Sequence, residues 1–192
     1  AIITGLVGSE MCIRDSATMR AYLKKMTEAP YTAVMPEAAP KTVIAALGPK
    51  MLELAASETA GAHPYFSSPD HTAMAREIMG PDAWLCPEQK VILESDPTKA
   101  RELARPVAGI YQNLPNYRNN WLRMGLTEDD INQLSDKLID TTFAWGPAET
   151  IKARIQAHLD AGANHVCIQP VNPNGQFGDL HWEALEALAP NR

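Results

Sequence analysis

A short Gly-Pro turn is the stretch of this sequence best suited to hold an anion. Residues 45–51 read AALGPKM and follow an apolar run. Their small side chains leave the backbone accessible, and Pro49 is well placed to open a helix. Free N–H groups and the helix dipole favour a phosphate at such a helix N-terminus. The same residues also fit an ordinary strand-to-helix turn, and their spacing leaves both interpretations open.

A second candidate site follows in residues 63–71, which read HPYFSSPDH. His63 and Tyr65 lie near the end of an apolar segment, with Ser67 just beyond, and these side chains could line a pocket. The alternative is that His63 is a hydrogen-bonded core residue and that the SSPD segment simply caps the next helix.

Other polar residues carry weaker signals. Glu88 and Gln89 stand at the start of an apolar segment, away from the carboxyl ends of strands where ligands bind, so we expect a structural role. Gln169 lies near the end of the last apolar segment but has no evident partner. We expect Tyr117 and Trp121 to pack in the interior. The sequence contains no metal-ligand spacing, nucleophile elbow, P-loop or G-x-G-x-x-G motif.

Short apolar segments alternate with helical patterns along the chain. We expect strands at residues 42–47, 62–66, 88–95 and 164–171. We expect helices at residues 18–29, 50–61, 67–80, 97–114, 115–125, 127–146, 147–162 and 179–190. Pro106 is expected to kink or divide the fourth of these helices.

This alternation is typical of an α/β protein with about four parallel strands and helical crossovers. The sheet could be a small doubly wound sheet or part of a (β/α)8 barrel. A complete barrel needs about 250 residues, more than the 192 of this chain.

Composition narrows the function classes. The formal net charge of −6 argues against a nucleic-acid or anionic membrane surface. No apolar run approaches the roughly 18 residues of a membrane span. The three widely spaced cysteines fit reduced thiols better than a disulfide framework or a zinc site. We therefore expect a cytoplasmic protein that acts on a small molecule and binds no metal.

Three stretches, in the same order, resemble the carboxyl-terminal half of the luciferase-like oxidoreductases, and more narrowly the coenzyme F420-dependent branch. They are TVIAALGPKMLELAASETAGAHPYF, LPNYRNNWLRMGLTEDD and AHLDAGANHVCIQPV. The resemblance runs from about Ala17 to the end of the chain. It implies a (β/α)8 TIM barrel in which the four expected strands are the fifth to eighth.

The resemblance also implies a function. Such enzymes exchange a hydride between C5 of the deazaflavin F420 and a small organic substrate, and the related flavin branch uses FMN, often with molecular oxygen. The loop after the fifth strand commonly holds the cofactor phosphate through backbone N–H groups. The residues assigned in this way are Ala46, Leu47, Gly48 and Pro49 for the cofactor, and His63, Tyr65 and Ser67 for the substrate pocket. An FMN-dependent monooxygenase and a non-enzymatic α/β binding module remain alternatives.

Residues 6–16 (LVGSEMCIRDS) resemble the translation of a transposon-end sequencing adapter. We therefore expect residues 1–16 to be a non-native leader and residues 17–192 to be a partial barrel. Strands one to four and the catalytic residues they carry would then be missing, so no catalytic residue is named. Such a fragment would be inactive alone, would expose strand edges at residues 42–47 and 164–171, and could form a homodimer only when full-length.

Overall fold

The computed structural model describes residues 16–34, 36–38, 40–174 and 179–190. The expected leader, apart from Ser16, lies outside these residues. Within the described residues the strands are β1 (Val43–Ile44), β2 (Gly61–Ala62), β3 (Trp84–Leu85), β4 (Glu88–Ile92), β5 (Phe143–Trp145) and β6 (Cys167–Pro170). The helices are α1 (Ser16–Glu28), α2 (Pro49–Glu58), α3 (Pro69–Met79), α4 (Pro97–Tyr111), α5 (Pro115–Arg123), α6 (Glu128–Asn132), α7 (Asp136–Thr142), α8 (Ala148–Asp160) and α9 (Trp182–Leu188).

The strands form two parallel sheets, with orders β1-β2-β3 and β5-β4-β6. Only Cys86 and Pro87 separate β3 from β4, so one extended segment passes from the first sheet into the second. Backbone hydrogen bonds continue across this break, because Cys86 N donates to Ala62 O at 2.9 Å and Glu88 N donates to Pro64 O at 2.8 Å. The two sheets are thereby joined through β2 and its continuation.

The parallel α/β class is confirmed, and β1, β4 and β6 fall within three of the four expected strands. The strand expected at residues 62–66 is reduced to β2, which shares only Ala62 with that range. The expectation of one helix throughout residues 127–146 is wrong in two places: residues 133–135 separate α6 from α7, and residues 143–145 form β5. Phe143 and Ala144 are buried and pair with β4, which outweighs the local helical pattern. The short strand β3 was also not foreseen.

Pro106 does not divide α4, which runs from Pro97 to Tyr111 with this proline inside it. Proline removes one backbone donor from a helix. The helix nevertheless continues, because one of its faces is buried on both sides of the proline. The buried residues of that face are Ala100, Ala104, Val107 and Ala108.

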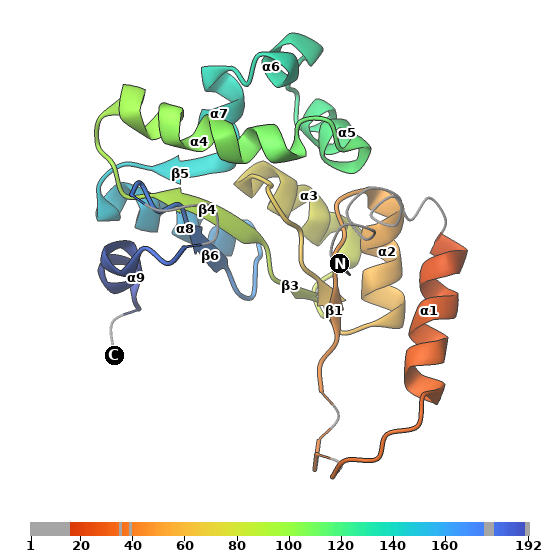
Figure 1. Ribbon diagram of the computed structural model, residues 1–192. Coiled ribbons are helices and arrows are strands. Elements are labelled where there is room, and N and C mark those ends of the chain that lie inside the picture. The colour runs from red at the N-terminus through yellow and green to blue at the C-terminus, as the bar shows by residue number, and fades with distance from the viewer. Residues whose placement is uncertain (1–15, 35, 39, 175–178, 191–192) are drawn as a thin grey trace, which may run out of the picture.

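Helices cover both faces of the second sheet. Figure 1 shows α4 to α7 on one side of this sheet and α8 and α9 on the other. Because side chains alternate along a strand, Ile92 contributes to the cluster on the α4 side and Val91 to the cluster on the α8 side. The first sheet has its own core against α2 and α3. Within the described residues, every helix is too short or too polar to cross a membrane.

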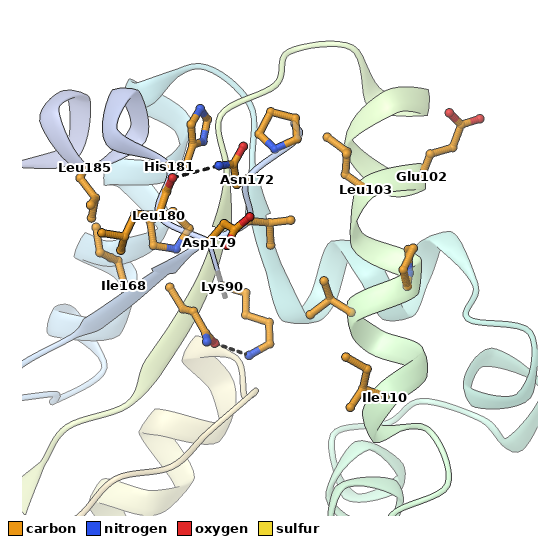
Figure 2. Close-up of a pocket in the computed structure, with 16 residues that line it drawn as sticks. Lys90, Glu102, Leu103, Ile110, Ile168, Asn172, Asp179, Leu180, His181 and Leu185 are labelled. Carbon is orange, nitrogen blue, oxygen red and sulfur yellow. Dashed lines mark hydrogen bonds between the residues drawn. The ribbon is translucent and has the colours of Figure 1, made fainter. Parts of the chain in front are cut away.

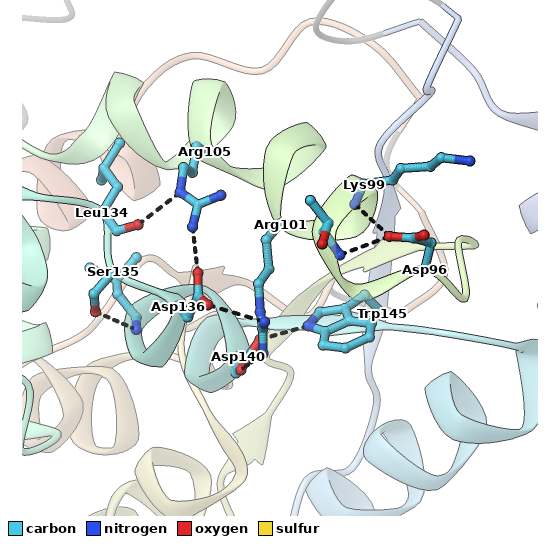
Figure 3. A network of polar contacts seen from close by, with 11 residues as sticks. Asp96, Lys99, Arg101, Arg105, Leu134, Ser135, Asp136, Asp140 and Trp145 are labelled. Carbon is cyan, nitrogen blue, oxygen red and sulfur yellow. Dashed lines mark hydrogen bonds and ion pairs between the residues drawn. The ribbon is translucent and has the colours of Figure 1, made fainter.

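Arginines fix α4 in position over α7 and β5. Arg101 binds both carboxylate oxygens of Asp140, at 2.7 and 3.1 Å, and Trp145 Nε1 donates to the same carboxylate at 2.8 Å. Arg105 pairs with Asp136 one turn further along. Figure 3 shows these contacts as one continuous network. It matters for the site described below, because α4 provides one wall of a pocket.

A substitution at Gly61 tests how closely β2 approaches β3. A Cβ atom at this position would lie 1.9 Å from the backbone oxygen of Trp84, so Gly61→Ala must push the two strands apart. We expect its free energy of unfolding in urea to fall by more than about 3 kcal/mol, at the upper end of single-residue effects.

The matched control is Gly109→Ala in α4, where the added Cβ would make an ordinary 3.7 Å contact with Leu134. This change should be neutral or stabilise the protein by up to about 1 kcal/mol, because alanine favours helix. Equal stabilities for the two variants would contradict the proposed clash.

Candidate functional site

The predicted anion turn lies between β1 and α2. Gly48 is the N-cap of α2, and its carbonyl accepts hydrogen bonds from Met51 N and Leu52 N, both at 3.0 Å. Pro49 occupies the first turn, as the sequence predicts. Of the four predicted cofactor residues, Ala46 is buried, Leu47 and Gly48 are half-buried, and Pro49 is exposed. The turn therefore reaches the surface at Gly48 and Pro49.

Two side chains from elsewhere in the chain approach this turn. His71 Nε2 donates to the carbonyl oxygen of Leu47 at 2.9 Å, and burial lowers the pKa of His71, which favours the neutral ring. Arg123, the last residue of α5, lies against Gly48, because a Cβ atom built on that glycine would be 3.4 Å from Arg123 Nη2. Among the described residues, no carboxylate forms a salt bridge with Arg123.

The turn thus combines a helix N-terminus, a glycine that faces Arg123, and an arginine without an acidic partner among the described residues. Backbone N–H groups and a guanidinium are the donors that bind phosphate in proteins. These residues fit the phosphate group of a nucleotide-like cofactor. Sequence reasoning missed Arg123, because α5 carries no signal that it returns to a turn so far back in the chain.

The three predicted pocket residues do not form one group. His63 Nδ1 lies 2.6 Å from Cys86 O, so the ring is tied to the extended segment between β3 and β4. Ser67 is fully buried, and its hydroxyl has no hydrogen-bond partner among the described residues. Tyr65 contacts a cluster of polar side chains on β4 and β6.

That cluster is built around a buried lysine that sequence reasoning missed. Lys90 Nζ lies 3.2 Å from Glu88 Oε1 and 2.9 Å from Gln169 Oε1. Tyr65 Oη donates to the same Gln169 oxygen at 2.6 Å, and Lys90 Nζ stands 3.8 Å from the centroid of the Tyr65 ring. Glu88 also accepts from Phe66 N at 3.0 Å. The Lys90 and Glu88 side chains are only 1% and 4% exposed.

Burial decides the protonation behaviour of these groups. It lowers the pKa of Lys90 to about 8, against the attraction of Glu88. It also raises the pKa of Glu88, against the attraction of Lys90. Burial raises the pKa of Tyr65 far above its ordinary value, so its hydroxyl keeps its proton and acts as a donor. Lys90 and Glu88 thus form a hydrogen-bonded pair that is buried in the interior.

A pocket of about 490 Å³ opens beside this cluster, between α4 on one side and residues 168–173 and 179–185 on the other. Figure 2 shows Leu103 and Ile110 on the α4 side, Leu180, His181 and Leu185 on the opposite side, and Lys90 between them. His63, Tyr65 and Ser67 do not line this pocket, but Tyr65 reaches it indirectly through Gln169. Its size is in the usual range for a small-molecule site.

The described part of the chain contains no candidate metal site. No group of three or more His, Cys, Asp or Glu side chains lies close enough together there to hold a metal ion.

Comparison with known proteins identifies the family. The model of the luciferase-like monooxygenase family matches residues 18–165. The chain belongs to this family. The search of curated proteins gave no match. Family membership agrees with the resemblance that the sequence motifs carry.

Two solved structures share the fold of this chain. An F420-dependent secondary alcohol dehydrogenase in complex with an F420–acetone adduct has a TM-score of 0.56 and 19% identity, over 81% of this chain and 51% of its own. A coenzyme F420-dependent tetrahydromethanopterin reductase from Methanopyrus kandleri has a TM-score of 0.50 and 16% identity, over 77% and 48%. This chain of the luciferase-like family therefore spans about half the length of each structure.

The buried ion pair between Lys90 and Glu88 predicts how substitutions of these residues change the free energy of unfolding. Lys90→Met leaves the Glu88 carboxylate buried without its counterion, which typically costs about 3–5 kcal/mol of unfolding free energy. The double variant Lys90→Met/Glu88→Gln should lose less than the two single variants added together, because it leaves no unpaired charge. Urea denaturation at pH 7 measures all three.

The loss of unfolding free energy in the Lys90→Met variant should also depend on pH. Burial raises the pKa of Glu88 and Lys90 lowers it. Removing Lys90 therefore raises this pKa further, so the folded variant takes up a proton at a higher pH than the folded wild-type chain does. The deficit of Lys90→Met should therefore shrink as the pH falls from 7 toward 4.5. The control is Lys152→Met, which removes an exposed ion pair with Glu149 and should cost less than about 1 kcal/mol. A Lys90→Met variant as stable as this control at pH 7 would refute the assignment.

Proposed function

We propose that the chain is part of an F420-dependent oxidoreductase and that the Gly48 turn holds the phosphate of the cofactor. The observation that carries this proposal is the Arg123 guanidinium beside Gly48 in a member of the luciferase-like family. Among the described residues it donates to Asn120 Oδ1 at 3.3 Å and has no carboxylate partner. The printed names of the two similar structures, both F420-dependent enzymes, support the choice of cofactor.

The residues of the turn have distinct parts in this proposal. Arg123 supplies a charge-assisted hydrogen bond, and Pro49 sets the first turn of α2 so that the helix N-terminus faces the phosphate. His71 holds the Leu47 carbonyl oxygen and thereby the backbone before Gly48. Bound F420 would supply a ring carbon that accepts or releases a hydride. Catalytic residues are not assigned.

The proposal includes the barrel architecture. We place β1, β2, β4 and β6 as the fifth to eighth strands of a (β/α)8 barrel. In support, β1 and β6 stand at the edges of their sheets and pair with one neighbour each among the described residues. A small-molecule substrate, a cytoplasmic location and a homodimer of the longer protein belong to the same proposal.

Cofactor titration tests this function. We expect the chain to bind F420 and Arg123→Gln to bind it about tenfold more weakly, since a hydrogen bond to a charged group contributes about 1.5–3 kcal/mol. Fluorescence of the deazaflavin measures the affinity, and circular dichroism confirms that each variant is folded. Arg105→Gln is the control, because that arginine pairs with Asp136 on the α7 side and should leave the affinity unchanged.

The competing cofactor is FMN, which the chain would bind in place of F420 if it belonged to the flavin branch. Binding of FMN alone would replace F420 in the proposal. If a folded chain binds neither cofactor, the proposal that it is part of an oxidoreductase is refuted. If the Arg123→Gln and Arg105→Gln variants bind F420 with equal affinity, the cofactor phosphate does not bind at the Gly48 turn.

A further inference from the structure

The amide of Gln169 is held in one orientation by two donors. Lys90 Nζ and Tyr65 Oη both point at its oxygen, from 2.9 and 2.6 Å. An ammonium group has no lone pair to offer, so the atom that faces Lys90 must be the amide oxygen rather than the nitrogen. The –NH2 group of Gln169 is therefore directed away from Lys90 and Tyr65.

This –NH2 group has no acceptor among the described residues. Every hydrogen bond of the Gln169 side chain within them goes to its oxygen. The residue lies on the edge strand β6, is only half-buried and lines the pocket of about 490 Å³. The amide thus offers two donors at the wall of a pocket, with their direction already set.

The charges around the pocket disfavour an anion. Its cationic side chain is Lys90, and Glu88 already compensates that charge in the buried pair. Two further carboxylates, Glu102 and Asp179, line the pocket itself. Asn172 and His181 add two further polar side chains, and the rest of the lining is apolar, formed by leucine, isoleucine, valine and proline side chains of α4, β6 and the residues around Leu180. A ligand for this site is small, mostly apolar and uncharged.

We infer that this pocket binds a small apolar molecule through a neutral carbonyl or hydroxyl oxygen that accepts a hydrogen bond from the Gln169 amide. Lys90 and Tyr65 act as positioning residues, because they hold the amide oxygen and leave the nitrogen for the ligand. The assignment of this ligand as the substrate rests on the proposed function, in which such a carbonyl or alcohol would exchange the hydride. The binding itself does not depend on the cofactor.

Nuclear magnetic resonance tests the inference on the 192-residue chain without cofactor. The side-chain –NH2 signal of Gln169 is assigned by its loss in Gln169→Glu. Titration with 2-octanone, a neutral ketone, should shift this signal with saturation, while octanoate, of similar length but anionic, should shift it much less. An unshifted Gln169 signal, or tighter binding of octanoate, would overturn the inference.

Variants separate the donor from the pocket. Gln169→Glu keeps the shape of the side chain and can still accept from Lys90 and Tyr65, but it replaces the donor with a carboxylate. It should weaken 2-octanone binding roughly tenfold or more. Tyr65→Phe removes one of the two contacts that orient the amide and should weaken binding less. Gln133→Glu, at an exposed position on the end of α6, is the matched control and should leave binding unchanged.

These results are distinguishable from a failure of the proposed function. If the chain binds 2-octanone through Gln169 but binds neither F420 nor FMN, the ligand pocket is supported and the proposed oxidoreductase function is refuted. Wild-type affinity for 2-octanone in a folded Gln169→Glu variant would refute the role of the amide, whatever the outcome of the cofactor titration.

Discussion

The ion pair between Lys90 and Glu88 is the interaction on which this structure depends. Removing two charges from water is costly, and their attraction offsets that cost only when further hydrogen bonds satisfy them. The chain supplies two such hydrogen bonds from separate segments, together with contacts to aromatic rings. Phe66 N, after β2, donates to Glu88, the Gln169 oxygen on β6 accepts from Lys90, and aromatic rings surround the ammonium. The charged pair therefore links the end of the first sheet to the second sheet.

The same pair connects the two candidate sites. Phe66, whose backbone has a φ of 58°, is held by Glu88 and packs edge-on against Trp121, with the ring centroids 5.2 Å apart. Trp121 lies in the last turn of α5, two residues before Arg123. The contact between Phe66 and Trp121 thus anchors the helix that carries the arginine to the Gly48 turn. On the other side, Lys90 orients Gln169 toward the pocket.

The sequence alone was sufficient for the α/β class, for most of the helices and for the Gly-Pro turn. Short apolar segments predicted the parallel α/β class, and the Gly-Pro pattern predicted the start of α2 at Pro49, because proline and the helix N-terminus have matching backbone requirements. The cap at Ser68 was also predictable, and its hydroxyl accepts from His71 N. Local propensity failed at β5, where pairing with β4 overrides the helical pattern of the preceding residues.

Only the tertiary structure decided which side chains meet. Gln169 had no evident partner in the sequence, and nothing in the sequence singled out Lys90. They meet because β4 and β6 are parallel neighbours in a register that places Lys90 opposite Gln169. Arg123 reaches Gly48 for a similar reason, since helix packing brings distant segments together. Sequence patterns report the period and the ends of elements, whereas burial of an ion pair or the approach of an arginine depends on long-range packing that no local pattern encodes.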